Sequence, residues 1–258
     1  MSAPDVTVPG AWAGGPVTDR ATCVLEGNAG PMTLDGTNTW VLSAPGSGEA
    51  VVVDPGEDDP AHRAGITAVL AGRRVALVVG THRHRDHVGG LDAFLAQHPA
   101  PVARTAGEHR VAGLGLRVLA TPGHTSDSLC VLLDSGELLT GDTLLGRGST
   151  VIATGNQQGV EQGGDLGDYL RSLELLLSLE ADVVLPGHGP PLPDPRAALS
   201  RQREHRLARL EQVRCAVAAG HRDVEDVVTA VHGDVEGTVR WAAAQSVRAQ
   251  LDYLAQQP

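Results

Sequence analysis

Short apolar runs, each ended by a turn residue, recur along the chain as far as residue 190. Residues 50–53, 75–79 and 181–185 are rich in Val, Leu and Ala and stop at Gly or Pro. Runs of this length and composition are typical of strands buried on both faces. Turns rich in Gly and Ser join other runs in pairs, which predicts β-hairpins at 39–53 and 128–140. Further strands are predicted at 21–25, 102–104 and 116–119.

Apolar residues at helical spacing predict helices between these strands. Asp59 can cap a helix over 58–71, and Pro60 suits its first position. Residues 90–98 and 168–180 predict two more helices, the second with a regular row of Leu. Many short strands with interspersed helices favour two sheets packed face to face with helices outside. We therefore predict an α/β (α+β) fold.

The pattern of apolar residues changes after a proline-rich stretch at 190–195, and this stretch predicts a stiff linker. Beyond it the pattern is helical, with helices expected at 197–219, 224–231 and 238–255. We divide the chain into a domain of residues 1–195 and a small helical domain of residues 196–258. A Gly- and Gln-rich stretch at 155–164 predicts a flexible loop.

The composition mainly argues against several classes of protein. The 258 residues carry a net charge of −11, which disfavours broad nonspecific binding to nucleic acid. All 20 basic residues are Arg, which together with abundant Ala, Gly and Val is typical of a GC-rich, bacterial genome. Three widely spaced Cys do not form a disulfide framework, the first five residues lack a signal-peptide pattern, and no apolar run could cross a bilayer. We expect a cytoplasmic protein with no membrane contact.

Candidate chemistry is concentrated in Thr-His-Arg-His-Arg-Asp-His at 81–87, where a predicted strand stops and a helix starts. His82 and His84 are two residues apart, so in an extended backbone they lie on the same side. Asp86 continues that alternation, and the adjacent His87 points elsewhere. One metal ion could take His82 and His84, and a second could take Asp86 and His87. The competing interpretation is a polar surface loop that is rich in His.

Three more candidate ligands share the same kind of position. His124, Asp142 and His188 each follow a short apolar strand and sit in a Gly-flanked turn. If these strands end on one edge of the sandwich, the side chains converge. Counting ligands then predicts two metal ions, with Asp142 as the bridge between the two sets. The first set is His82, His84 and His124, and the second is Asp86, His87 and His188.

Imidazole and carboxylate ligands without thiolates favour two Zn²⁺ ions, with Mn²⁺ or Fe as alternatives. Three protein ligands and a bridge leave room for water, which is typical of a catalytic site. We expect a bridging hydroxide to be the nucleophile. Asp86 is the predicted catalytic residue, which orients or deprotonates the attacking water besides binding metal. The sequence has no Gly-x-Ser-x-Gly elbow that would supply a Ser nucleophile.

These motifs resemble those of the metallo-β-lactamase superfamily. The likeness rests on the 81–87 motif, Thr-Pro-Gly-His-Thr at 121–125, Gly-Asp at 141–142 and Pro-Gly-His-Gly at 186–189, in that order. It implies an αββα sandwich with a dinuclear zinc site at the seven ligands named above. Residues 30–40, residues 144–150 and the helical tail further resemble the β-lactamase-like protein 2 group, which implies a C-terminal winged-helix domain.

The resemblance leaves the substrate open. Eukaryotic members of that group are single-strand-selective endoribonucleases, which favours RNA, as does the Arg-rich segment 196–214. Fungal relatives are polyketide thioesterases, and the superfamily includes glyoxalase II, lactonases and β-lactamases, which favours a small thioester, lactone or β-lactam. The net charge and the aromatic content of 2% argue against RNA. The 155–164 loop looks longer than is usual in the group and could reach the site.

Two other classes of protein and two candidate residues for substrate binding complete the hypotheses. The protein could be a nucleic-acid-binding regulator with a vestigial metal site, or an iron sensor or dioxygenase on the same fold. The intact ligand set argues against the first, and the pair Asp86 and His87 against the second. Trp40 and Thr125 are weak candidates for substrate binding, with a hairpin role and a turn role as their alternatives. The helical tail could bind nucleic acid, form a homodimer or wall the active site.

Overall fold

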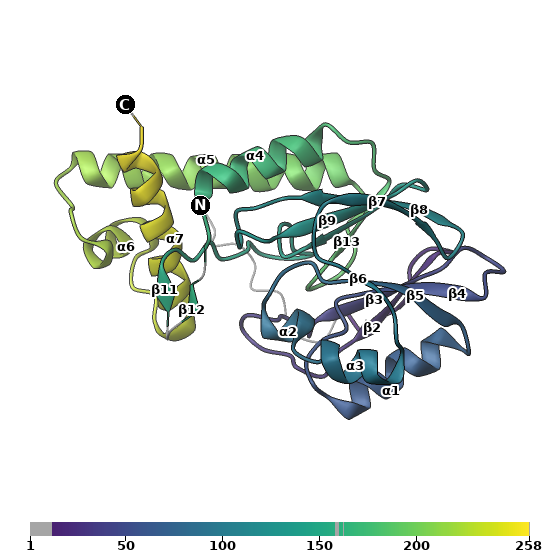
Figure 1. Cartoon of the computed structure of the whole chain (residues 1–258). Helices are drawn as coiled ribbons and strands as arrows, with labels where there is room; N and C mark the ends of the chain where they lie inside the picture. The colour runs from purple at the N-terminus through teal and green to yellow at the C-terminus, as the bar shows by residue number, and fades with distance from the viewer. Residues whose placement is uncertain (1–11, 158–159, 162, 258) are drawn as a thin grey trace.

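Two β-sheets pack face to face, and helices cover the outer face of each in the computed structural model (Figure 1). The structure describes residues 12–157, 160–161 and 163–257. The first five residues, on which the signal-peptide prediction rests, lie outside this part. The layer order helix, sheet, sheet, helix confirms the predicted sandwich.

The first sheet has six strands in the order β1-β2-β3-β4-β5-β6. The strands from β1 to β4 pair antiparallel, and β4, β5 and β6 run parallel. Their bounds are Gly15–Pro16, Ala21–Leu25, Asn38–Leu42, Glu49–Val53, Arg74–Val79 and Val102–Ala103. Helices α1 (Pro60–Leu70) and α3 (Leu91–Gln97) cover its outer face, and the short α2 (Arg85–Val88) follows β5.

The second sheet has five strands in the order β13-β10-β9-β8-β7. Strands β10 and β13 run parallel, and the other neighbours pair antiparallel. The bounds from β7 to β10 and of β13 are Gly107–Val111, Leu114–Ala120, Leu129–Leu133, Glu137–Gly141 and Val183–Pro186. Helices α4 (Leu166–Leu177) and α5 (Pro195–Ala218) lie across its outer face (Figure 1).

Three apolar clusters hold these layers together. The central one fills the space between the sheets, with Trp40, Leu116 and Leu139 among its buried members. A second joins the first sheet to α1 and α3 around Ile66 and Phe94. The third joins the second sheet to the helices above it; members of this last cluster are Leu138, Tyr169, Leu173, Leu199 and Ala249. Burial of this kind stabilises a fold by about 25 cal/mol per Å² of apolar surface.

The helical tail continues this packing. Helix α5 is followed by α6 (Val224–His232) and α7 (Gly237–Ala255), and a small cluster around Val213, Val228 and Val247 binds the three together. Ala249 of α7 belongs to the cluster of the second sheet, so the tail is docked on the sandwich. Helices are present as predicted, and no strand lies among residues 195–257, all of which the structure describes. None of the described helices has the length and hydropathy needed to cross a membrane.

Two local predictions differ from the structure, and one edge strand was not predicted. Residues 190–195, predicted as a stiff linker, are part of the packed fold, because Leu192 forms a two-way backbone bridge with Val184 of β13, and Pro195 already begins α5. The 155–164 stretch contains a two-stranded hairpin, β11 (Asn156–Gln157) and β12 (Val160–Glu161), while residues 158–159 and 162 lie outside the described part. Strand β7 was not predicted, because its sequence Gly-Glu-His-Arg-Val has little apolar content at an edge position.

Candidate metal centre

The seven predicted ligands lie together at one edge of the sandwich. Residues 82–87 follow β5 of the first sheet, whereas His124, Asp142 and His188 follow β8, β10 and β13 of the second. The site therefore spans both sheets, and each ligand is held where a strand ends. Among the described residues, three groups of side chains could hold a metal ion: His82, His84 and His124; His82, His87 and Asp142; and Asp86, His87 and His188.

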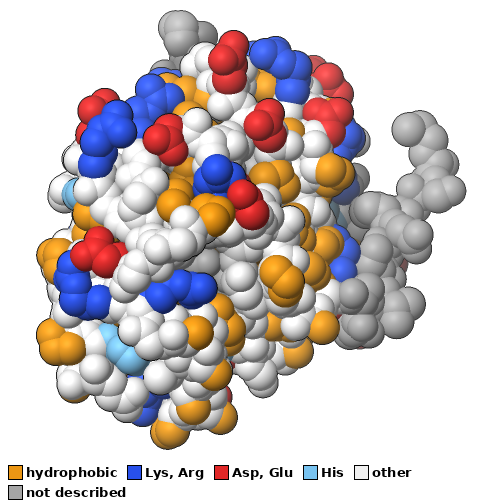
Figure 2. Space-filling model, turned by 90° about the vertical axis from the view of Figure 1, so that its right-hand side faces the viewer, with side chains coloured by type: hydrophobic (Ala, Val, Ile, Leu, Met, Phe, Trp, Pro, Cys, Tyr) orange, Lys and Arg blue, Asp and Glu red, His pale blue; other side chains and the backbone are white. Residues whose placement is uncertain are grey.

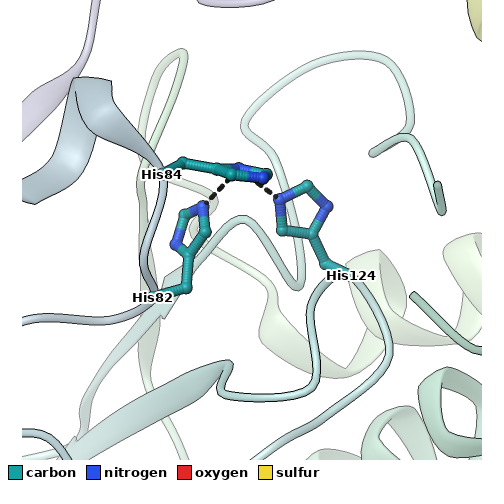
Figure 3. A group of neighbouring side chains, drawn as sticks. All are labelled: His82, His84 and His124. Atoms are coloured by element: carbon teal, nitrogen blue, oxygen red, sulfur yellow. Dashed lines mark hydrogen bonds between the residues drawn. The ribbon is translucent and has the colours of Figure 1, made fainter. Parts of the chain in front are cut away.

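The first group is a set of three imidazoles whose ring nitrogens converge (Figure 3). His84 Nδ1 lies 2.9 Å from His82 Nε2 and 3.1 Å from His124 Nε2. The opposite nitrogens are held by acceptors: His124 Nδ1 lies 2.8 Å from the carbonyl oxygen of Val151, and His82 Nδ1 lies 3.1 Å from Thr81 Oγ1. Both imidazoles therefore donate outward and direct an unprotonated Nε2 into the centre, the arrangement that a metal ligand needs.

The second predicted set, Asp86, His87 and His188, combines two imidazoles with a carboxylate and is called the second group from here on. His188 Nε2 lies 3.3 Å from His87 Nε2 and 3.2 Å from Asp86 Oδ2. His87 Nδ1 donates to Asp54 Oδ2 at 2.7 Å, and His188 Nδ1 lies 3.2 Å from the carbonyl oxygen of Gly36. Two Nε2 lone pairs facing each other at this distance repel unless a cation or a proton lies between them.

Asp142 lies between the two groups. Its Oδ2 is 3.8 Å from His124 Nε2 of the first group and 3.4 Å from His188 Nε2 of the second. Its Oδ1 is 3.4 Å from His87 Nε2 but has no hydrogen-bond partner among the described residues, although it is buried. A buried carboxylate oxygen without a partner is costly, so the donor set fits a pair of cations with Asp142 between them.

The electrostatics of the two groups differ. Burial lowers the pKa of His82, His84 and His124, the last to about 4, so these imidazoles are neutral at pH 7 and are ready to bind a cation. Burial also acts to lower the pKa of His188, but Asp142 and Asp86 outweigh it and raise this pKa to about 9. The second group therefore favours a positive charge, which a proton or a metal ion can supply.

Asp54 is a site residue that the sequence patterns did not single out. It is buried with a φ of 53°, and besides His87 it accepts hydrogen bonds from the backbone nitrogen and Oγ1 of Thr81, at 2.7 and 2.6 Å. It thus supports ligands from both groups, because Thr81 Oγ1 in turn contacts His82. Its position directly after β4, like that of the ligands after their strands, was the available signal; the following Pro-Gly made it read as a turn.

The two weak candidates for substrate binding are buried and have hydrogen-bond partners. Trp40 is 1% exposed, belongs to the core between the sheets and donates a hydrogen bond to the carbonyl oxygen of Pro186. Thr125 is fully buried, and its Oγ1 lies 2.8 Å from Ser128 Oγ across the turn. Neither side chain is exposed to a substrate, so the hairpin and turn alternatives agree with these contacts.

Gly123, just before His124, is a residue whose replacement is expected to distort this edge. It has a φ of 138°, and a Cβ there would lie 2.3 Å from Tyr169 Cα of α4. Gly123→Ala is therefore expected to lower the free energy of unfolding by about 3 kcal/mol or more. Gly46→Ala is the control, because Gly46 also has a positive φ, 79°, but open space around it; about 1 kcal/mol is expected there. Urea unfolding of both variants tests this, and equal losses would contradict it.

The fold and the converging side chains define the class: an αββα sandwich with a cluster of His and Asp side chains at one edge that could hold metal. The family model described as the metallo-beta-lactamase superfamily matches residues 32–115 and 106–188. Lactamase-like protein aptB of Emericella nidulans is 33% identical over 88% of this chain and 78% of its own length. The beta-lactamase-like protein 2 homolog of Caenorhabditis elegans is 32% identical over 92% of this chain and 85% of its own.

An atrochrysone carboxyl ACP thioesterase of Aspergillus chevalieri is 31% identical over 85% of this chain and 75% of its own length. Among solved structures, a beta-lactamase domain protein from Burkholderia ambifaria has a TM-score of 0.75 at 23% identity and covers 97% of this chain and 90% of its own. This Burkholderia ambifaria structure shares the fold of the present chain. The chain belongs to the metallo-β-lactamase superfamily and is a hydrolase of that fold.

Proposed function

We propose that this hydrolase binds two divalent metal ions and cleaves an acyl thioester. His82, His84 and His124 would hold one ion, and Asp86, His87 and His188 the other, with Asp142 shared. The observation that carries this proposal is the position of Asp142, within 3.8 Å of ring nitrogens from both groups and with one oxygen unpartnered. Imidazole and carboxylate donors without a thiolate suit Zn²⁺ best, and Mn²⁺ or Fe²⁺ next.

Bound divalent ions supply Lewis acidity, which activates water and polarises a carbonyl oxygen. The protein's own contribution is to orient the water and accept its proton. Asp86 suits this role, because its side chain is 22% exposed whereas that of Asp142 is 11% exposed. Thr37 Oγ1 donates to Asp86 Oδ2 at 3.3 Å and fixes the carboxylate. A thiolate leaving group needs no general acid, so this arrangement suffices for a thioester.

A small acyl substrate fits the surface better than RNA. Three of the six aromatic residues, Trp40, Phe94 and Tyr169, are fully or almost fully buried and offer no platform for stacking bases. On the face shown in Figure 2, Arg side chains are interspersed with Asp and Glu, and they form no continuous basic track. Relatives named as ACP thioesterases, at 31% and 32% identity, support the same choice.

Hydrolysis of a short acyl thioester and of a single-stranded RNA, measured side by side with the metal-loaded protein, tests this proposal. We expect thioester hydrolysis that Asp86→Ala reduces by at least about 1000-fold. Asp92→Ala, at an exposed position on α3, is the matched control and should retain the wild-type rate. If the protein instead cleaves RNA, Asp86→Ala abolishes that cleavage and no thioester is hydrolysed, then the substrate is RNA and not a thioester. Activity that survives Asp86→Ala would refute the assigned role of the site.

The winged-helix likeness of the tail, a homodimer and the cytoplasmic location stay predictions. For the tail, the contacts support a further role. Arg206 of α5 donates to the carbonyl oxygen of Thr150, and Thr150 Oγ1 lies 3.0 Å from His124 Nδ1. Gln202 Nε2 of the same helix donates to Tyr169 and Ser149. We therefore favour, among the three roles, a tail that supports the wall of the active site.

A further inference from the structure

A cavity of about 540 Å³ lies between the tail and the segment that supports His124, beside the hydrogen bonds that join them. Residues 144–151 form one wall, and Leu192 with residues of α5, α6 and α7 forms the others. Thr150 and Val151 belong to this wall and also contact His124 through Thr150 Oγ1 and the Val151 carbonyl oxygen. The cavity therefore adjoins the metal centre through one shared segment, but none of the seven candidate ligands lines it.

The lining of this cavity is positively charged. It contains no Asp or Glu, and its basic members are Arg147, Arg201, Arg206, Arg209, His205 and His232. Arg147 is paired with Asp35, and Arg209 donates to the carbonyl oxygen of Val231 and to Gln212. Arg201 has no hydrogen-bond or ion-pair partner among the residues that the structure describes. Burial lowers the pKa of His205, and the nearby Arg206 and Arg209 lower it further.

Buried polar atoms without partners are concentrated at the same place. Six such side-chain atoms occur in the described part of the chain, and three belong to residues that line the cavity: Arg147 Nε, Arg206 Nε and Gln250 Oε1. Arg206 is 5% exposed and Gln250 is 3% exposed. Leaving a buried polar group unpaired is unfavourable, so such a concentration is expected where a ligand completes the hydrogen bonds.

We propose that this cavity binds a phosphate-bearing ligand. Guanidinium groups bind phosphate oxygens with charge-assisted hydrogen bonds, and Arg201 and Arg206 provide donors that the protein leaves unused. Gln250 Oε1 accepts from a hydroxyl or amide group of the same ligand. Apolar residues of the wall, Leu144, Leu192 and Val239, contact its uncharged part. The binding itself does not depend on which bond the metal centre hydrolyses.

Isothermal titration with pyrophosphate, on the intact metal-loaded protein, tests the site. Arg201→Gln is expected to weaken binding at least roughly 10-fold, because it removes a charge-assisted hydrogen bond to the phosphate; a tenfold change in Kd corresponds to about 1.4 kcal/mol. Arg201 is exposed and has no partner, so the variant should fold normally. Arg248→Gln is the matched control: it removes the same charge from an exposed position on α7 outside the cavity. Equal affinities of the wild type and both variants would overturn the proposal, because pyrophosphate would then bind elsewhere.

The phosphate could belong to the substrate or to a separate small molecule, and kinetics distinguish the two. Acetyl-coenzyme A carries phosphates, whereas S-acetyl-N-acetylcysteamine does not. If the cavity holds part of the substrate, Arg201→Gln raises KM for the first thioester alone. If it holds a separate ligand, pyrophosphate binds with the same sensitivity to Arg201→Gln, while KM for both thioesters stays unchanged. Absence of any thioester hydrolysis would refute the proposed substrate and leave the pyrophosphate result to decide on the cavity.

Discussion

Asp142→Asn is expected to abolish hydrolysis while leaving the fold intact. The carboxylate lies within 3.8 Å of ring nitrogens from both groups, and an amide of the same shape removes the negative charge that both cations would share. We expect kcat to fall by at least about 1000-fold, which corresponds to roughly 4 kcal/mol of lost transition-state stabilisation. Steady-state kinetics of thioester hydrolysis, with metal content measured on the same samples, checks the result.

The control for this prediction is Asp92→Asn, the same chemical change on the exposed surface of α3. It should leave both kcat and metal content at wild-type values. Circular dichroism of the Asp142→Asn protein separates loss of metal from loss of fold. A folded Asp142→Asn protein with full activity would contradict the shared role of this carboxylate.

Asp54→Asn is expected to weaken metal binding without removing a ligand. Asp54 holds His87 Nδ1 and both donors of Thr81, and an amide group must turn its own N–H toward at least one of them. Losing such a supporting contact lowers metal affinity by roughly 10- to 100-fold. It should also lower the free energy of unfolding by about 1–3 kcal/mol, because a buried donor stays unsatisfied.

Competition with a chelating dye measures the affinity of the Asp54→Asn protein for Zn²⁺. Raising the free Zn²⁺ concentration should restore most of kcat, because the seven ligands are still present. This rescue separates a supporting residue from a ligand, since Asp142→Asn should not respond in the same way. Wild-type affinity in the Asp54→Asn protein would mean that His87 needs no carboxylate partner.

The sequence predicts the site better than it predicts the details of the fold around it. His124, Asp142 and His188 could be grouped with residues 82–87 because every one of them follows an apolar strand and precedes a turn. That regularity reflects a physical fact: strand ends on one edge of a sandwich converge, whatever their separation along the chain. The same pattern predicted the two-sheet architecture, whose strands, apart from β1 and β7, read as short apolar runs between turns.

The features that could not be predicted from the sequence depend on contacts between segments that are distant along the chain. Asp54 follows its strand as the ligands do, but only the structure brings it to 2.7 Å from His87. Strand β7 lies at an edge with a polar sequence, where pairing with β8 decides the conformation. The cavity between residues 144–151 and the tail requires that α5 and α7 dock on the second sheet, which no local pattern records.

Metal stoichiometry tests the central claim most directly. The protein, stripped of metal and titrated with Zn²⁺, should bind two ions per chain, and the Asp142→Asn protein should fail to bind both tightly. Mass spectrometry of the intact protein under native conditions counts the ions without reference to any substrate. Two ions per folded chain is the predicted result. A folded wild-type chain that saturates with one ion, or binds none, would contradict the assignment of the two groups.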